Sequence, residues 1–409
     1  MIKESRIPRK ALEGVKVVAF IQGITGPLTA SGLAAYGAEV IRIETQTRLE
    51  WHRQAGPFIG NVSTPDRAVP YLCFNSGERA ITLNLKAPKA MDIMRRIVKW
   101  ADVIVENFSG STMDSLGLGY KDLLKIKPDI IMLSAAIYGQ KGPFAHVRGY
   151  GLTLTALTGM PAITGFPDQL PQFPGFAITD FIAPRANILA IVAALDYRAR
   201  TGKGQYLDAA QAESAFPLLT PVILEYQANG HEAERMGNRS SSAAPHGLYR
   251  CQGENRWCTI TVMNDEQWEK FCQVIGKPDW VSSPKFGTLL GRLKNVDELD
   301  RLVESWTLQH TPEAVMKMMQ AAGVPAGVVQ SGQDLDKDPQ VAGRGLFWKL
   351  ETPEIGAFSY TGMPFKLSLT PYEVKRAPKL GEDNESFYIK TLGLTDEEFV
   401  QYMADGVFE

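Results

Sequence analysis

The 409-residue sequence lacks the motifs of several common enzyme classes. It has no GxxxxGKS/T phosphate loop and no GxSxG elbow, which disfavours P-loop NTPases and serine hydrolases of the α/β type. The turn after the first β-rich run reads QGITGP at 22–27, which is not GxGxxG, and Pro27 has no N–H to donate to a phosphate. A dinucleotide-dependent dehydrogenase is therefore disfavoured, and the candidate nucleophiles reduce to carboxylates and lone thiols.

Cysteine, histidine and net charge are also scarce. The four cysteines and five histidines match no common zinc, redox or HExxH spacing, so we expect reduced thiols and no metal site. A formal net charge of -2 gives no basic field for nucleic acid or an anionic membrane. No apolar run approaches the roughly 20 residues of a membrane span. Residues 1–12 are polar and basic without an apolar signal core, so we expect a cytoplasmic protein.

What the sequence does contain is an alternation of β-rich and helical segments. The expected strands lie at 15–20, 39–44, 80–85, 102–106 and 130–135, and the expected helices between them at 28–36, 88–101 and 120–126. This order predicts a doubly wound, open parallel sheet. Ligands of such sheets bind beyond the carboxyl ends of the strands, which directs attention to four segments: 21–27, 45–51, 106–110 and 135–142.

The chain changes character after residue 229. Helices expected at 181–200 and 209–229 complete a large domain over 1–229. A loop rich in Ser, Ala, Pro and Gly at 237–253 opens a smaller α/β domain over 230–330. The segment 331–409 is rich in loops and is expected to pack back on the large domain.

Asp180 is the most suggestive carboxylate. It lies in the apolar run GFAITDFIA at 175–183, just before a helix that looks buried. Asp is a preferred helix N-cap, so a capping role is open. A carboxylate in a dry, apolar pocket is also a better nucleophile, because water no longer solvates its charge. The residues alone leave both readings open.

Several segments together resemble one family. They are AEVIRIE at 38–44, ADVIVENF at 101–108, YGQKGP at 138–143, TGKGQ at 201–205, GNR at 237–239 and GVPAG at 323–327. In this order and spacing the chain resembles the class III CoA-transferases of the CaiB/BaiF type, which include formyl-CoA transferase and the carnitine CoA-transferases. The likeness runs from about residue 12 to beyond residue 339.

The resemblance implies a two-domain α/β fold in interlocked dimers and a catalytic aspartate at Asp180. The Asp180 carboxylate would attack an acyl-CoA to give a mixed anhydride and then an aspartyl-CoA thioester, from which an acceptor acid takes the CoA. Coenzyme A would thus be a substrate, and no permanent cofactor or metal would be needed. Succinyl-CoA as donor and a substituted dicarboxylate such as benzylsuccinate as acceptor are hypotheses.

The resemblance also implies contacts with CoA. The positions are Leu83, Lys86, Asn107, Phe108, Arg148, Tyr150, Arg42 and Arg79. Lysine and arginine can pair with the CoA phosphates, and aromatic rings can pack on pantetheine or adenine. The alternative for each is a surface cation or a core aromatic, and for Arg42 and Arg79 that alternative is as well supported.

The chain departs from the family pattern at two places. Glu78 stands where a lysine is usual, so no cation is available there for a phosphate. Ser240, Ser241 and Ser242 replace a glycine-rich loop that shields the nucleophile, which reduces flexibility but adds hydroxyl donors. The adjacent Arg239 is a candidate for holding a substrate carboxylate, and a structural arginine is the alternative.

Two other functions stay open from the sequence. The acyl-CoA racemases of the same superfamily use a His–Asp pair, but this chain has Tyr150 at the His position, and a Tyr pKa of about 10 makes a poor base at neutral pH. A catalytically silent CoA-binding subunit of a heteromer is the third reading. The expected partners are acyl-CoA, carboxylic acids and a second copy of the chain or a homologous subunit, without nucleic acid or membrane.

Overall fold

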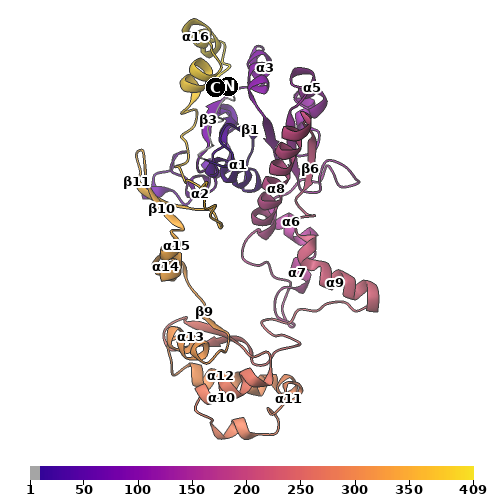
Figure 1. Ribbon diagram of the computed structural model, residues 1–409, viewed down its shortest axis with the longest axis vertical. Helices are drawn as coiled ribbons and strands as arrows, with labels where there is room; N and C mark the ends of the chain where they lie inside the picture. The colour runs from indigo at the N-terminus through magenta and orange to yellow at the C-terminus, as the bar shows by residue number, and fades with distance from the viewer. Residues whose placement is uncertain (1–9) are drawn as a thin grey trace, which may run out of the picture. The chain divides into compact units, whose positions relative to one another are not determined.

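The computed structural model describes residues 10–409, which form two compact units (Figure 1). The larger unit comprises 10–160, 174–230 and 342–409, and the smaller unit comprises 161–173 and 231–341. The sequence placed the smaller domain at 230–330. In the structure the smaller unit continues to residue 341 and also takes up the segment 161–173.

A parallel sheet forms the centre of the larger unit. Its strands are β1 (Lys16–Phe20), β2 (Glu39–Glu44), β3 (Arg79–Thr82), β4 (Val103–Glu106), β5 (Ile131–Ala136) and β6 (Tyr206–Ala210). The strand order β3-β2-β1-β4-β5-β6, with every pairing parallel, is that of a doubly wound sheet. The predicted fold class is confirmed, and the order reverses between β1 and β4.

Strand β6 corrects the sequence prediction, which began a helix at residue 209. Tyr206–Ala210 instead pairs in parallel with β5, and the helix begins at Phe216. Alanine favours helices and is depleted in strands, so Ala209 and Ala210 point to a helix locally. Pairing with the exposed edge of β5 overrides that preference.

Both faces of the sheet are covered. The helices of this unit are α1 (Thr25–Ala35), α2 (Val69–Phe74), α3 (Ala90–Trp100), α4 (Thr112–Ser115), α5 (Tyr120–Ile126), α6 (Gly151–Leu157), α8 (Ile178–Thr201), α9 (Phe216–Asn229) and α16 (Asp396–Ala404), and α7 (Met160–Ile163) and α15 (Pro339–Arg344) lie at its boundaries. Val18 and Phe20 pack in the core with α3 and α5, whereas Val17 and Ala19 pack in the core with α1 and α8. Alternate residues of β1 thus enter two cores, as expected for a strand buried on both faces.

Helix α8 is the one helix in residues 10–409 that is long and apolar enough to cross a membrane by length and composition. The sequence prediction found no apolar run of that length, because Asp180, Arg185 and Asp196 interrupt this stretch. A third of the apolar stretch is buried, and the helix contacts α1 and β5. Its buried residues Ile191 and Ala194 pack in the same core as α1.

The C-terminal segment completes the larger unit. Strands β10 (Phe347–Thr352) and β11 (Gly356–Thr361) form an antiparallel hairpin, and β11 contacts α2. Phe387, Tyr388 and Phe408 enter the core formed with α3 and α5. The segment therefore supplies part of the core around the sheet and is not an appendage.

The smaller unit has its own core. Strands β7 (His246–Arg250), β8 (Trp257–Thr261) and β9 (Ala326–Val328) form an antiparallel sheet, covered by α10 (Asp265–Val274), α11 (Leu289–Lys294), α12 (Val296–Thr307) and α13 (Pro312–Ala321), with α14 (Gly332–Lys337) following. The core includes Ile260, Trp268 and Phe271. Strand β7 lies in the stretch 237–253 that the sequence predicted as loop, because pairing with β8 orders a segment with weak local preference.

Candidate active site

A cavity of about 460 Å³ lies at the carboxyl ends of β1, β4 and β5 in the larger unit. Its wall includes residues from all four segments to which the sequence directed attention: 22–25, Trp51, 107–109 and 135–137. The rest of the cavity wall includes segment 147–152, Asp180 and Gln211. The strand order reverses between β1 and β4, so the loops after these two strands turn away from each other. A ligand cavity is expected between such loops.

Asp180 reaches this cavity from the first turn of α8. The N-cap of α8 is Ala177, so the reading of Asp180 as the N-cap is wrong. Its Oδ1 accepts a hydrogen bond of 3.2 Å from Thr25 Oγ1 and a second hydrogen bond from Gln211 Nε2. Both donors are neutral, so the carboxylate is held in place without a direct ion pair.

Burial raises the pKa of Asp180 above its ordinary value of 3.8. The hydrogen bonds from Gln211 and Thr25 and the positive charge that His52 can carry act in the opposite direction. Desolvation is the largest of these effects, because burial disfavours the charged form. The carboxylate is therefore less solvated than one on the surface, which favours nucleophilic attack.

Gly151 faces the second carboxylate oxygen. A Cβ at this position would lie 2.1 Å from Asp180 Oδ2 and 2.4 Å from the Cβ of Ala177. Any side chain would collide with the carboxylate or with the start of α8. Glycine is thus required by the close approach of α6 to α8.

Four of the predicted CoA contacts line the cavity: Asn107, Phe108, Arg148 and Tyr150. Asn107 ties the loops after β1 and β4 together, since its Oδ1 accepts from Gln22 N at 2.9 Å and its Nδ2 donates to Gln22 O at 2.7 Å. Arg148 is exposed and makes no hydrogen bond or ion pair within residues 10–409. Its charge is therefore available to a ligand.

Three aromatic residues line the cavity: Trp51, Phe108 and Tyr150. Tyr150 is 76% exposed, and its ring meets that of Trp51 edge-on at 6.2 Å between centroids. A large exposed ring next to a cavity is a suitable packing surface for an apolar or aromatic part of a ligand.

The other predicted CoA contacts lie outside the cavity wall. Leu83 is buried in the core with α3, and Lys86 is exposed. Arg79 forms ion pairs with Glu39 at 2.6 Å and with Asp383 at 3.0 Å. Arg42 is fully buried. Contacts of these four residues with CoA stay predictions, and the partners of Arg42 and Arg79 favour the structural alternative.

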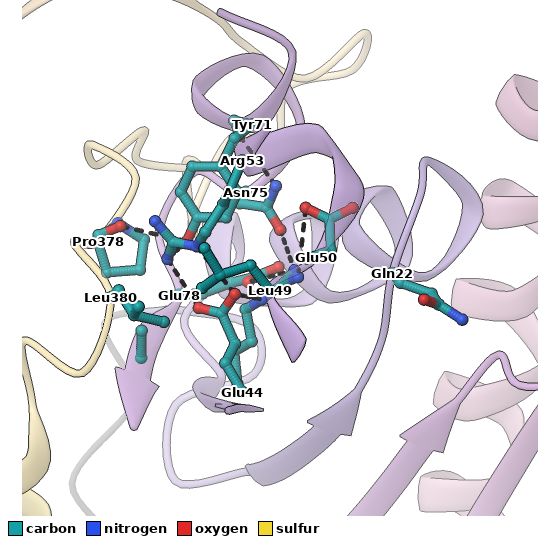
Figure 2. A network of polar contacts seen from close by, with 12 residues as sticks. Gln22, Glu44, Leu49, Glu50, Arg53, Tyr71, Asn75, Glu78, Pro378 and Leu380 are labelled. Carbon is teal, nitrogen blue, oxygen red and sulfur yellow. Dashed lines mark hydrogen bonds and ion pairs between the residues drawn. The ribbon is translucent and has the colours of Figure 1, made fainter. Parts of the chain in front are cut away.

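Arg42 belongs to a buried polar network, shown around Arg53 and Glu78 in Figure 2. Arg53 donates to both oxygens of Glu44, at 2.9 and 2.7 Å, and to Tyr71 Oη at 2.6 Å. The guanidinium of Arg42 lies 3.3 Å from Glu44, 3.7 Å from Glu50 and 3.8 Å from Glu78. Glu78, the departure from the family pattern, thus points into the protein and faces Arg42.

This network reaches the cavity through Gly23. Glu50 Oε1 accepts a 2.9 Å hydrogen bond from Gly23 N, and His52 Nδ1 lies 3.0 Å from Gly23 O. Gly23 precedes Thr25, the hydroxyl donor to Asp180. The buried charges therefore fix the turn between β1 and α1 that forms one wall of the site.

Arg239 and the serine segment belong to the smaller unit. Arg239 pairs with Asp297 and lies 3.6 Å from Asp300, and Ser240 Oγ lies 3.2 Å from Ser242 Oγ. Two carboxylates thus already neutralise Arg239. Its role, and that of Ser240–Ser242, in binding a substrate acid stays a prediction.

The sequence prediction missed Thr25, Gln211, Trp51 and Gly151 as site residues. Thr25 and Trp51 lie in two of the four segments expected to border the ligand site, so their place after a strand could have identified them. Gln211 follows β6, and no signal pointed to it because that strand was predicted as helix. Residues 10–409 contain no group of three or more His, Cys, Asp or Glu that could hold a metal ion.

Comparisons with known proteins show the family to which the chain belongs. Residues 12–384 match the family model of CoA-transferase family III. The succinyl-CoA–D-citramalate CoA-transferase of Chloroflexus aurantiacus is 31% identical, over 98% of this chain and 99% of its own. The formyl-CoA:oxalate CoA-transferase of Rhodopseudomonas palustris strain BisB18 is 29% identical, over 98% and 97%.

Solved structures show the same relationship. The crystal structure of a CAIB/BAIF family protein from Brucella suis superposes with a TM-score of 0.85 at 30% identity, over 93% of this chain and 99% of that one. The likeness thus extends over most of this chain. The chain belongs to CoA-transferase family III and is a class III CoA-transferase.

Proposed function

We propose that this enzyme moves CoA from an acyl-CoA donor to a carboxylic acid through covalent intermediates on Asp180. One observation carries the proposal: the Asp180 carboxylate lies in the wall of the cavity with Oδ1 hydrogen-bonded and Oδ2 next to Gly151. Oδ2 accepts no hydrogen bond from residues 10–409, so it is the carboxylate oxygen left for attack on a thioester carbon.

The proposed reaction needs no proton transfer. Asp180 Oδ2 attacks the donor thioester, the C–S bond breaks, and a mixed anhydride and CoA thiolate result. The thiolate then attacks Cγ of Asp180 and expels the donor carboxylate, which leaves an aspartyl-CoA thioester. The acceptor carboxylate attacks the same Cγ, and the released thiolate takes the new acyl group. Each step exchanges one anion for another, so the energy of the thioester is conserved.

CoA would be held by residues of the cavity wall. Arg148 supplies an unpaired cation for a phosphate of CoA. The rings of Tyr150 and Phe108 supply apolar surface for pantetheine or adenine. Asn107 is occupied with Gln22, and we assign it the role of shaping the cavity floor.

For the substrates we propose succinyl-CoA as donor and a dicarboxylate as acceptor. The names of the two relatives above include succinyl-CoA, formyl-CoA, D-citramalate and oxalate. Succinate, citramalate and oxalate each carry two carboxylates, whereas formate carries one. Trp51 and Tyr150 add apolar surface at the cavity, which suits a substituted dicarboxylate such as benzylsuccinate. We also propose a cytoplasmic location, which is consistent with charged, water-soluble substrates of this kind.

The geometry of the cavity disfavours a racemase. It requires a His opposite the aspartate, and His52 is buried with its Nδ1 beside Gly23 O, outside the cavity wall formed by residues 10–409. Proton transfer on both faces of a substrate needs two exposed bases.

The test is the variant Asp180→Asn. We expect it to bind CoA but to lose transfer by at least about 10³-fold, because removing a nucleophile removes the covalent route. Wild-type protein incubated with succinyl-CoA and then with hydroxylamine or borohydride should carry a modification at Asp180 by peptide mass spectrometry. Succinate, citramalate, oxalate and benzylsuccinate serve as the acceptor panel.

Asp196→Asn is the matched control, since Asp196 lies on the same helix in an exposed ion pair with Arg200. It should transfer CoA at the wild-type rate and leave the label at Asp180 unchanged. Near-normal turnover by Asp180→Asn would overturn the proposed mechanism. Wild-type protein that binds CoA but is labelled by no donor would instead point to a silent subunit.

A further inference from the structure

The two hydrogen bonds on Asp180 both fall on one oxygen. Thr25 Oγ1 and Gln211 Nε2 donate to Oδ1, while Oδ2 lies toward Gly151. Thr25 and Gln211 are themselves buried, at 4% and 8% exposure, so their donor groups are fixed by packing. Oδ1 is thereby held by two donors, whereas Oδ2 accepts no hydrogen bond from residues 10–409.

Thr25 and Gln211 reach Asp180 from separate elements. Thr25 opens α1, and its backbone oxygen accepts a 2.7 Å hydrogen bond from Thr29 Oγ1. Gln211 directly follows β6, and its N–H donates to Ala136 O at 2.9 Å. Both donors are anchored through backbone hydrogen bonds in the layer around the sheet, so neither needs to move to keep its contact with Oδ1.

We propose that Thr25 and Gln211 form an oxyanion hole for the Cγ carbon of Asp180, an inference that rests on the covalent route proposed above. When Oδ2 forms the bond to the donor acyl group, Oδ1 becomes the carbonyl oxygen of the anhydride. Attack of CoA thiolate on Cγ places a full negative charge on Oδ1, and expulsion of the donor carboxylate through Oδ2 restores the carbonyl.

The same two donors act a second time. In the aspartyl-CoA thioester Oδ1 is again a neutral carbonyl oxygen. Attack by the acceptor carboxylate at Cγ again puts the charge on Oδ1, and loss of CoA thiolate removes it. Hydrogen bonds that strengthen between the neutral carbonyl and the oxyanion lower the barrier of both steps. The first and last steps develop charge on a substrate oxygen instead, so these donors do not stabilise it.

Because only the two attacks at Cγ place charge on Oδ1, we expect the loss of either donor to slow these two steps. Gln211→Met removes the amide donor at similar length, and Thr25→Val removes the hydroxyl at similar shape. We expect each change to slow the two attacks at Cγ by about 10²-fold, the usual effect of losing one oxyanion donor. The first acyl transfer to Oδ2 and the KM for acyl-CoA should change much less.

The measurement follows the single steps by rapid quench and intact-protein mass spectrometry. Each protein is loaded with CoA by prolonged incubation with succinyl-CoA, freed of small molecules and mixed with succinate, and the loss of the CoA mass from the protein is timed. In a second experiment succinyl-CoA is mixed with free enzyme. Both variants should then accumulate the succinyl anhydride, which hydroxylamine converts to a hydroxamate, before the CoA adduct appears.

Two further variants separate catalysis from loss of structure. Thr25→Ser keeps the hydroxyl and should recover most of the rate lost in Thr25→Val. Thr82→Val removes another buried hydroxyl, which donates to Phe408 O at 2.9 Å and lies outside the cavity wall, and it should lower stability without changing either step.

The outcomes are distinguishable. A CoA adduct that decays at the wild-type rate in Gln211→Met and Thr25→Val would overturn the oxyanion hole while leaving the covalent route intact. Equal slowing of all steps without accumulated anhydride would also overturn it and assign the two residues a positioning role. A wild-type protein that forms no adduct at Asp180 would overturn the proposed function and this inference together.

Discussion

At the scale of single residues, the buried network behind the cavity carries more negative than positive groups. Arg42 and Arg53 face the carboxylates of Glu44, Glu50 and Glu78, and all five side chains are buried. Neither oxygen of Glu78 has a hydrogen-bond partner, and burial raises the pKa of Glu78 to about 8. Glu78 is thus the carboxyl group that stays protonated at neutral pH, because ionising it would add an unbalanced buried charge.

A pH dependence of stability follows from Glu78. Its pKa in the folded protein is above the ordinary value of 4.5, so between pH 4.5 and about 8 the folded protein holds a proton that the unfolded chain lacks. Stability from this group is complete below pH 4.5 and is lost as pH rises through 8. Glu78→Gln, which mimics the protonated form, should therefore unfold at higher urea concentration than wild type at pH 9 and at a similar concentration at pH 5.

Glu382→Gln is the control for this measurement. Glu382 pairs with Arg376, and that hydrogen bond holds the pKa of Glu382 below its ordinary value. The substitution should therefore destabilise the protein by a similar amount at pH 9 and pH 5, since the stability from a lowered pKa is lost only as pH falls below 4.5. An effect of Glu78→Gln that is the same at pH 5 and pH 9 would contradict the protonated state assigned to Glu78.

At the scale of elements, the site depends on how closely the start of α6 approaches the start of α8. The approach is possible because Gly151 opens α6 without a side chain. Thr155, one turn later, donates to Gly151 O at 2.7 Å and is fully buried, which fixes the turn. The distance between the two helices therefore sets the space around Asp180 Oδ2.

Gly151→Ala should test this arrangement. The added methyl group would overlap Asp180 Oδ2 and Ala177 Cβ, so the carboxylate must rotate or α6 must shift. We expect kcat to fall by about 10²-fold or more, since displacing a reacting group by about 1 Å costs that much, while circular dichroism stays unchanged. Gly343→Ala is the control, because a Cβ there meets nothing within 4 Å. Wild-type kcat in Gly151→Ala would show that Oδ2 does not need this space.

At the scale of the whole molecule, apolar side chains gather on the outside of α9. Leu218, Leu224 and Tyr226 are each more than half exposed, at 54, 54 and 56%. A helix in a compact unit normally buries its apolar face, so an exposed one favours contact with another chain. This exposure favours the interlocked dimer that the sequence resemblance implied, and we propose that the partner is a second copy of this chain.

We therefore expect the purified enzyme to sediment as a homodimer without a second gene product. The double variant Leu218→Glu, Leu224→Glu places two charges in that contact and should increase the monomer fraction in sedimentation velocity, since buried unpaired charge is costly. Val400→Glu on α16 introduces a charge at another exposed apolar position and serves as control. A wild-type monomer at micromolar concentration would contradict the homodimer, and dimerisation only with an added homologue would favour the heteromer.

Most strands of the larger unit, the family and the candidate nucleophile could be predicted from the sequence, because each is indicated by a short local pattern. β-rich runs and helical periodicity indicated five of the six strands and their doubly wound arrangement, since alternation of elements with short turns leaves few topologies open. The short motifs indicated the family, and an apolar run before a helix drew attention to Asp180. Strands β6 and β7 were missed because their order comes from pairing with β5 and β8 rather than from their own residues.

The tertiary structure alone decided the environment of the nucleophile. Thr25 and Gln211 lie 155 and 31 residues from Asp180 in the sequence, yet both donate to the same carboxylate oxygen. It also placed Arg42, a predicted CoA contact, and Glu78, a departure from the family pattern, in one buried network. A sequence pattern records which elements form, whereas the direction of each side chain follows from the packing of those elements, which depends on residues distant in the chain.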